Sequence, residues 1–272
     1  MTTVPDFDYE LASDLDGALA AVGSGATPIH GGTELLPAMA YGVMAPERVV
    51  SLRAIADLKQ CRVTGDRLML GSGMTHRDIA RHPIVRAHAP VLAEVAAGVG
   101  NIRVRSTGTL GGNIAFAEPR SDVLITLAAL GATVDLASTT AQRSQPFGDF
   151  LLGPFEVDIR PGELIVSVSL DTADARQAVY RKIVRSERPV VGCCVARLRD
   201  GRWRLVIGAA TLMPTITEAD DLAGFDIEAI TKAIDPTEDL GGSAAYKRHL
   251  SRVVAERCRD AAAALEGTGT HE

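Results

Sequence analysis

The stretch Gly98-Val-Gly-Asn-Ile-Arg-Val-Arg-Ser-Thr-Gly-Thr-Leu-Gly-Gly-Asn113 ends in a double glycine between polar residues, which sets it apart from an ordinary loop. Glycine has no Cβ, so Gly111 and Gly112 can take a positive φ and let a ligand reach the backbone. Consecutive N–H groups in such a turn form a nest for an anionic oxygen. The Thr109 hydroxyl and the Asn113 amide add side-chain donors. We therefore predict an anion-binding turn at the end of this stretch.

A second double glycine lies upstream, in Ile29-His30-Gly31-Gly32-Thr33-Glu34-Leu35, directly after a strand-like run. A single double glycine is usually only a tight turn. Two turns of the same form, each with a polar side chain after the glycines, favour a pyrophosphate group bound from both sides. Neither turn has the spacing G-x-G-x-x-G or G-x-x-x-x-G-K-[ST], which argues against a Rossmann or P-loop site.

These motifs resemble those of the flavin-binding medium subunit of molybdenum hydroxylases, the family of xanthine dehydrogenase and aerobic carbon monoxide dehydrogenase. Family members have an apolar-Gly-Gly-[Thr/His]-polar turn near the N-terminus, and later [Thr/Ser]-x-Gly-Gly-Asn followed by Pro-x-Ser-Asp. This sequence has Gly31-Gly-Thr-Glu34, Thr109-Leu-Gly-Gly-Asn113 and Pro119-Arg-Ser-Asp122 in that order. The resemblance covers essentially the whole chain. His30 departs from the pattern, because the family usually has a small or aliphatic residue there.

The resemblance implies an α+β fold, with a two-subdomain FAD-binding module of the PCMH (vanillyl-alcohol oxidase-like) type and a smaller α+β C-terminal domain. We expect the FAD-binding module over residues 1–172, with subdomains of about 1–56 and 57–172. The C-terminal domain, of the carbon monoxide dehydrogenase flavoprotein type, is expected over 178–266. The resemblance also implies contacts with FAD, none of them catalytic, by Ile29, His30, Gly31, Gly32, Thr33, Glu34, Leu35, Val99, Thr109, Leu110, Gly111, Gly112, Asn113, Asp122, Ile165 and Lys182.

Several of these residues also have ordinary structural explanations. Asp122 follows a serine at a helix start, a common capping arrangement, and Glu34 at a helix start is favoured by the helix dipole without any function. The apolar residues at 99 and 165 could be core. Arg181 is an alternative to Lys182 as the flavin contact.

Composition bounds the class of protein. With 272 residues, 46% hydrophobic and 23% charged, the chain is a folded globular protein. Its net charge of −6 argues against nucleic-acid binding, which needs a cationic surplus to displace counterions. No apolar run approaches the roughly 18 residues of a membrane span, and the N-terminus lacks a signal-peptide pattern. We therefore expect a cytoplasmic protein without a transmembrane segment.

The chain does not have the residues for a metal centre. Its four cysteines, Cys61, Cys193, Cys194 and Cys258, contain no C-x-x-C pair and are expected to be core thiols. They cannot supply the four spaced thiolates of an iron–sulfur cluster. The six histidines show no metal-ligand spacing. Among them, His76 and His82 flank a short helix and are expected to be solvated.

Periodicity and capping signals predict the elements. Ser13 and Thr75 are the expected caps of two helices, and residues 171–177 are expected to be a linker between modules. Apolar residues and arginines alternate over residues 102–105, and the two arginines are expected to face solvent. Residues 137–145 are expected to be polar and exposed. The predicted helices cover 14–22, 34–41, 75–81, 84–97, 123–130, 147–150, 227–234 and 244–265. The predicted strands cover 27–30, 48–52, 61–64, 68–70, 133–136, 163–170, 179–184, 190–198 and 203–210.

The resemblance implies an FAD-carrying electron-transfer subunit of a multi-subunit molybdenum hydroxylase. A small 2Fe–2S subunit would supply electrons, a large molybdenum-binding subunit would oxidise the substrate, and NAD or another acceptor would take electrons from the flavin. Molybdopterin and the 2Fe–2S clusters are expected only in those partners. Two alternatives stay open. One is a self-contained FAD-dependent oxidoreductase, and the other is a non-enzymatic scaffold in which both double glycines are only turns.

Overall fold

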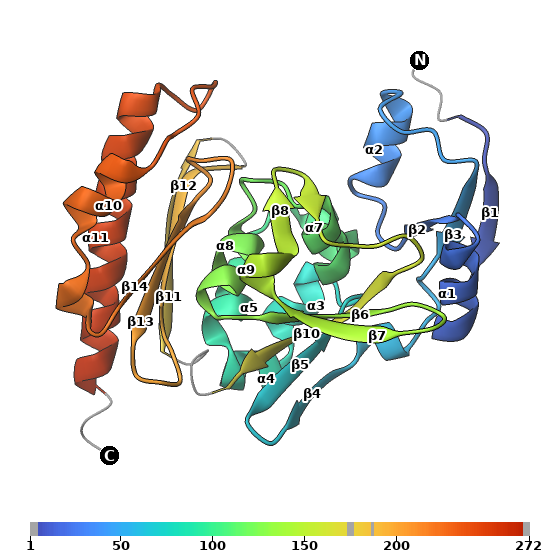
Figure 1. Ribbon diagram of the computed structural model, residues 1–272, viewed down its shortest axis with the longest axis horizontal. Coiled ribbons are helices and arrows are strands. Elements are labelled where there is room, and N and C mark those ends of the chain that lie inside the picture. Colours follow the sequence, from blue (N-terminus) through green and yellow to red (C-terminus); the bar gives the residue numbers. More distant parts are fainter. Residues whose placement is uncertain (1–4, 173–176, 186–187, 269–272) are drawn as a thin grey trace.

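Three larger sheets follow one another along the long axis of the molecule (Figure 1). The computed structural model describes residues 5–172, 177–185 and 188–268. The N-terminal strands lie at one end and the long C-terminal helix α11 at the other, with most of the shorter helices between them. This mixture of parallel and antiparallel sheets with separate helices confirms the predicted α+β class.

The N-terminal part has three parallel strands in the order β1-β3-β2, connected by two helices. Helix α1 begins after Asp14, whose carboxylate accepts a hydrogen bond from the Gly17 N–H at 2.8 Å. The predicted cap, Ser13, is wrong, because its hydroxyl donates to the Asp14 carboxylate instead. The elements are β1 (Asp8–Leu11), α1 (Leu15–Gly23), β2 (Thr27–Ile29), α2 (Leu35–Ala40) and β3 (Arg48–Ser51).

The middle part contains a five-stranded antiparallel sheet in the order β4-β5-β10-β6-β7. The predicted hairpin at residues 65–66 is confirmed. Strand β7, which was not predicted, forms the edge of the sheet, and its residues alternate between exposed and half-buried in a stretch that was expected to be polar and exposed. The elements are η1 (Asp57–Lys59), β4 (Cys61–Thr64), β5 (Arg67–Gly71), β6 (Thr133–Ala137), β7 (Gln142–Pro146), α9 (Phe147–Phe150), β8 (Leu151–Gly153), β9 (Glu156–Val157) and β10 (Leu164–Asp171).

Six short helices separate β5 from β6. Thr75 caps the first of them through a capping box with Asp78, as predicted. The single helix predicted over 84–97 is two helices, because Pro90 has no N–H to continue the first one. Residues 102–107 are also helical, which was not predicted. Arg103 is exposed as expected, whereas Arg105 is half-buried and donates to the carbonyls of residues 99 and 100. The helices are α3 (His76–Arg81), α4 (Pro83–His88), α5 (Pro90–Ala97), α6 (Ile102–Thr107), α7 (Leu110–Phe116) and α8 (Asp122–Ala129).

The C-terminal part is a four-stranded antiparallel sheet, β11-β12-β13-β14, followed by the short helix α10 and the 25-residue helix α11. The predicted linker at 171–177 lies mostly outside the described residues. Strand β14 was not predicted. The elements are β11 (Ala178–Arg185), β12 (Arg188–Arg197), β13 (Trp203–Gly208), β14 (Thr215–Ala219), η3 (Leu222–Gly224), α10 (Ile227–Ala233) and α11 (Ala244–Thr268).

Both faces of this C-terminal sheet are buried, with α11 on one side and α8 and α5 on the other (Figure 1). Adjacent residues on β12 therefore belong to different cores. Cys193 packs in the core beneath α11, and Cys194 packs in the core of the middle part. On the α8 side, Ile125 lies against Gly192 and Gly208. A Cβ added to these glycines would lie 3.0 Å and 2.6 Å from the Ile125 side chain.

The N-terminal and middle parts meet backbone against backbone at Gly31. A Cβ on Gly31 would lie 1.9 Å from the Thr107 carbonyl oxygen and 3.2 Å from the Gly108 Cα. Gly111 is packed in a similar way, since a Cβ there would lie 2.7 Å from the Ser72 Cβ. The positive φ predicted for Gly111 and Gly112 is wrong, because both belong to the first turn of α7. Among the glycines of the two turns, Gly32 has a positive φ, +68°.

We predict that Gly31→Ala lowers the stability of the apoprotein. The added methyl group would overlap a backbone carbonyl, which cannot move aside by changing rotamer as a side chain can. Overpacking of this kind costs about 1–3 kcal/mol, which corresponds to roughly 2–10 °C in Tm. Thermal unfolding followed by circular dichroism measures this shift. The control is Gly23→Ala, whose Cβ would meet only the Thr139 methyl group at 4.0 Å. Equal Tm values for the two variants would contradict the prediction.

Candidate functional site

A cleft brings the two double-glycine turns together. Of the residues that the sequence singles out, it is lined by Thr33, Glu34, Val99, Thr109, Gly112, Asn113 and Asp122. The N-terminal part supplies the first two, and the helices of the middle part supply the others. The prediction that the two turns face one site is therefore confirmed in its geometry. Residues that sequence reasoning did not assign also line the cleft, among them His76, Phe116, Glu118, Arg120 and Arg188.

The second turn is not the nest that the sequence predicts. The Leu110 and Gly111 N–H groups donate to Met74 O at 2.9 Å and Ser72 O at 2.7 Å. The Gly112 N–H donates to the Thr109 hydroxyl at 3.2 Å, and the Asn113 N–H donates to Thr109 O. All four backbone donors are thus used inside the protein. What this turn offers a ligand is the hydroxyl hydrogen of Thr109 and the amide of Asn113.

The first turn keeps its backbone donors free. Helix α2 begins after Glu34 without a side-chain cap. Among the described residues, no acceptor is recorded for the N–H groups of Thr33, Glu34 and Leu35. Free N–H groups at a helix start following a left-handed Gly32 are well suited to an anionic oxygen. The backbone donors free for a ligand are therefore those of residues 33–35 rather than those of residues 110–113.

Charged residues gather at one end of the cleft. Glu118 accepts a hydrogen bond from Arg120 Nε at 3.0 Å and also pairs with Arg188. Glu34 lies close to the Arg188 guanidinium and to the Glu118 carboxylate. Burial raises the pKa of its carboxyl group, while the Arg188 guanidinium acts in the opposite direction and Glu118 adds to the rise. Arg188 belongs to β12, so the C-terminal sheet forms part of the cleft wall.

Asp122 connects the middle part to the C-terminal sheet. Its carboxylate pairs with Lys182 Nζ at 2.5 Å and accepts a hydrogen bond from the Tyr180 hydroxyl. Burial, reinforced by the Asp122 charge, raises the pKa of Tyr180 well above its usual value. The helix cap is made by Ser121, whose hydroxyl accepts from the Leu124 N–H at 3.4 Å. Capping therefore does not explain Asp122, and its predicted contact with FAD stays a prediction.

Lys182 rather than Arg181 contacts the cleft residue Asp122, although Lys182 does not itself line the cleft. Lys182 Nζ also donates to Gly98 O at 3.3 Å, while the Arg181 guanidinium donates to the Tyr180 carbonyl. The other predicted contacts lie behind the cleft surface. Leu110 and Ile165 are buried in the core of the middle part. The half-buried members of the first turn that do not line the cleft are Ile29, His30, Gly31, Gly32 and Leu35.

His76 is not solvated as the sequence led us to expect. Its side chain is 2% exposed, because α3 packs beneath the two turns. Burial lowers the pKa of its imidazole to about 4. His82, at the other end of α3, is half-buried. A helix of six residues has too few repeats for its buried face to be read from the sequence.

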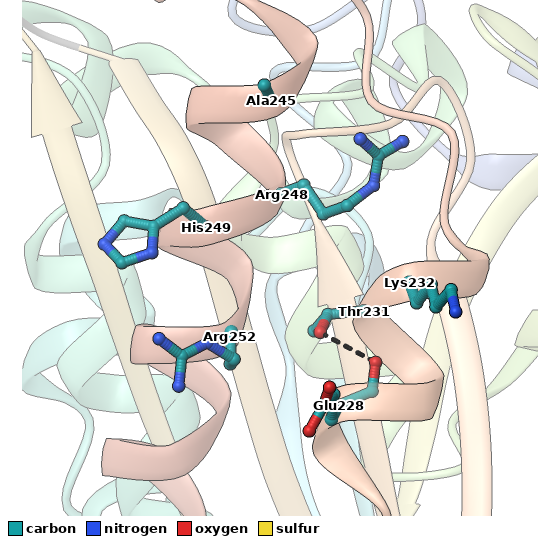
Figure 2. Close-up of a pocket in the computed structure, with 7 residues that line it drawn as sticks. All are labelled: Glu228, Thr231, Lys232, Ala245, Arg248, His249 and Arg252. Carbon is teal, nitrogen blue, oxygen red and sulfur yellow. Dashed lines mark hydrogen bonds between the residues drawn. The ribbon is translucent and has the colours of Figure 1, made fainter.

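A larger hollow of about 480 Å³ lies between α10 and α11 and contains none of the predicted residues. It is rich in cationic side chains. Figure 2 shows that they do not converge, since His249 and Arg252 point to one side of α11 while Arg248 points to the other. A ligand in this hollow would not meet a common set of donors, so we do not assign it a role.

Within the described part of the chain, no group of three or more His, Cys, Asp or Glu residues could hold a metal ion. The four cysteines are free thiols, three of them buried. Helices long and apolar enough to cross a membrane are also absent from the residues described.

Similarity to known proteins identifies the family of this chain. Residues 5–171 match the FAD binding domain in molybdopterin dehydrogenase. The chain belongs to this family. The chain is therefore an oxidoreductase component with FAD as its cofactor, and the predicted resemblance is confirmed.

Relatives match the chain over nearly its full length. The carbon monoxide dehydrogenase medium chain of Hydrogenophaga pseudoflava is 29% identical, with 95% of this chain and 97% of the relative covered. The glyceraldehyde dehydrogenase medium chain of Sulfolobus acidocaldarius is 28% identical, with 92% and 96% covered. The solved carbon monoxide dehydrogenase of Hydrogenophaga pseudoflava superposes with a TM-score of 0.87 at 26% identity, covering 96% of this chain and 99% of that chain.

The cleft has a donor set suited to FAD. The free N–H groups of residues 33–35 fit a pyrophosphate, and the Thr109 hydroxyl and Asn113 amide line the same cleft from the second turn. Val99 and Phe116 provide apolar surface for a flavin or adenine ring. The chain has a net charge of −6, and backbone donors bind an anion without a lysine cluster.

Gly112 gives a direct test of this site. It is exposed, and a Cβ there would meet only Thr109 Oγ1, at 3.1 Å. We predict that Gly112→Val fills the cleft and weakens FAD binding at least about tenfold, or 1.4 kcal/mol, with little change in apoprotein Tm. Gly111→Val serves as the contrast, because it should destabilise the apoprotein by overlap with Ser72. FAD titration and thermal unfolding measure both effects. A Kd for FAD in Gly112→Val equal to that of the wild type would refute the assignment.

The Asp122–Lys182 pair gives a second prediction. Its side chains are only 5% and 25% exposed, so the charges are weakly screened. A double-mutant cycle with Asp122→Asn and Lys182→Met should show a coupling of at least about 1 kcal/mol in the free energy of unfolding. The control cycle uses the exposed pair Arg252–Glu256, with expected coupling of about 0.5 kcal/mol or less. If the two cycles give the same coupling, Asp122 does not hold the C-terminal sheet in place.

Proposed function

We propose that this chain is the FAD-carrying electron-transfer subunit of a multi-subunit molybdenum hydroxylase. The observation that carries the proposal is a cleft with donors for FAD in a chain whose described residues contain no metal-binding cluster. The nearly full-length match to the medium chains of two other dehydrogenases supports it. Membership of the FAD-binding family is inconsistent with a scaffold in which both double glycines are only turns.

The side chains of this chain bind and orient the cofactor. FAD supplies the redox chemistry when bound. The backbone of residues 33–35 would hold the pyrophosphate, and the Asp122–Lys182 pair would fix charge and geometry where α8 meets the C-terminal sheet. The Glu118–Arg120–Arg188 cluster would limit access of water at one end of the cleft. No side chain in this scheme transfers a proton to or from the physiological substrate.

The partners follow from this division of labour. A 2Fe–2S subunit would deliver electrons to FAD, and a molybdenum-binding large subunit would carry the substrate site. NAD or another acceptor would receive the electrons. We also propose a cytoplasmic complex of these subunits.

For the domain division, we propose that residues 1–172 form the FAD-binding module, with a subdomain boundary near 56, and that 178–266 form the C-terminal domain. Three buried clusters, centred on the N-terminal, middle and C-terminal parts, support this division. The cluster of the middle part also takes in residues from one face of the C-terminal sheet, such as Cys194 and Val206.

We predict that the isolated chain binds about one FAD but cannot be reduced by the substrate of the complex, since it has no centre that oxidises the substrate. The measurement is anaerobic bleaching of the flavin absorbance after substrate addition. Carbon monoxide, purines, N-heterocycles and aldehydes are the substrates to screen. Adding the 2Fe–2S and molybdenum subunits should restore bleaching. The control is dithionite, which should bleach the flavin in both preparations.

Bleaching of the isolated chain by a substrate would instead favour a self-contained flavoenzyme. No bleaching even with both partners present would refute the electron-transfer role.

A further inference from the structure

His76 lies at the point where the two glycine turns converge. Its backbone N–H donates to Gly108 O at 3.1 Å, and the preceding Thr75 forms a β-bridge with Thr109. The capping box of Thr75 fixes the start of α3 at the same place. These backbone contacts determine where the imidazole of His76 is placed, which is on the wall of the cleft.

The ring has a defined orientation. A Cβ built on Gly108 would lie 3.4 Å from His76 Cδ2 and 3.4 Å from Thr33 Oγ1. Cδ2 is bonded to Nε2, so this edge of the ring faces Gly108 and the first turn. Nδ1 is attached to the opposite side of the ring. It is buried and has no hydrogen-bond partner among the described residues.

The buried nitrogen decides which tautomer the neutral ring adopts. A neutral imidazole has one N–H donor and one bare nitrogen acceptor. Buried N–H groups without an acceptor are rarer in proteins than acceptors without a donor. The proton therefore belongs on Nε2, at the edge that faces the turns, and Nδ1 is the bare acceptor. A donor is then available at the edge of the ring next to Gly108, the residue that precedes Thr109.

We propose that His76 is a cofactor-binding residue, whose Nε2–H group donates a hydrogen bond to an anionic oxygen of FAD between Thr33 and Thr109. This inference rests on the proposed function only in that FAD occupies the cleft, and it is independent of where the electrons go. It adds a side-chain donor from α3 to the donors of the two turns. It also explains why a histidine occupies this buried position. An apolar side chain would fill the space without burying an unpartnered nitrogen.

A structural role is the competing explanation, with the ring only filling space under the turns. Three substitutions separate the two roles. His76→Phe keeps a ring of similar shape without any donor. His76→Gln places an amide donor near the position of Nε2, and His76→Asn places one near the position of Nδ1.

The experiment is titration of FAD into apoprotein of the full chain, followed by flavin fluorescence, with the Tm of each apoprotein measured in parallel. We expect His76→Phe and His76→Asn to raise the Kd for FAD at least about tenfold and His76→Gln to stay within about threefold of wild type. The matched control is His82→Phe, at the other end of α3. Its Nδ1 is also buried without a partner, but it does not line the cleft, so the Kd should be unchanged.

Wild-type affinity in His76→Phe would overturn the proposal, as would equal weakening in the Phe and Gln variants. If His76→Phe does not fold, the Gln and Asn variants decide: tighter binding by the Gln variant supports the donor at Nε2, and equal binding refutes it. Binding of FAD is measured here without substrate or partners. A failure of this proposal is therefore distinct from a failure of the electron-transfer role.

Discussion

The contact of Gly31 with the backbone of residues 107–108 is the constraint on which the site depends. Two chain segments approach so closely there that a single methyl group does not fit. A Cβ on Gly31 would lie only 1.9 Å from the Thr107 carbonyl oxygen. This approach places the free N–H groups of residues 33–35 opposite Thr109. The α7 start is in turn tied to the strand-to-helix segment 72–76 by hydrogen bonds from Leu110 and Gly111. The relative position of the two turns is thus set by main-chain contacts, which vary less than side-chain rotamers.

The C-terminal sheet completes the cleft and also shares its core. One face of the sheet packs with the middle part and the other with α11. Its two polar connections to the cleft, through Lys182 and Arg188, come from neighbouring strands. A cofactor in the cleft therefore contacts a wall that is continuous with the apolar interior. The C-terminal sheet pairs two carboxylates of the middle part at this wall, Asp122 through Lys182 and Glu118 through Arg188.

Sequence reasoning was strongest where local chemistry was distinctive. The Gly-Gly motifs predicted one shared site, and the geometry agrees. The predicted reason for the glycines was only partly right. Local sequence does not show whether a missing Cβ leaves room for a ligand or for another part of the chain. Gly111 faces Ser72, and Gly112 faces the cleft. The burial of His76 was missed because it results from packing between segments far apart in sequence. The edge strands β1, β7 and β14 have exposed or polar residues and so lack the apolar alternation of inner strands.

The seating of Ile125 between Gly192 and Gly208 limits how this protein can acquire its cofactor. Opening the cleft by rotating the C-terminal sheet would pull this side chain out of a close-fitting groove and expose apolar surface on both sides. Hinged opening is therefore costly, in contrast to proteins whose domains close over a ligand like a clamshell. The cofactor has to enter through the mouth of a preformed cleft or be enclosed while the chain folds.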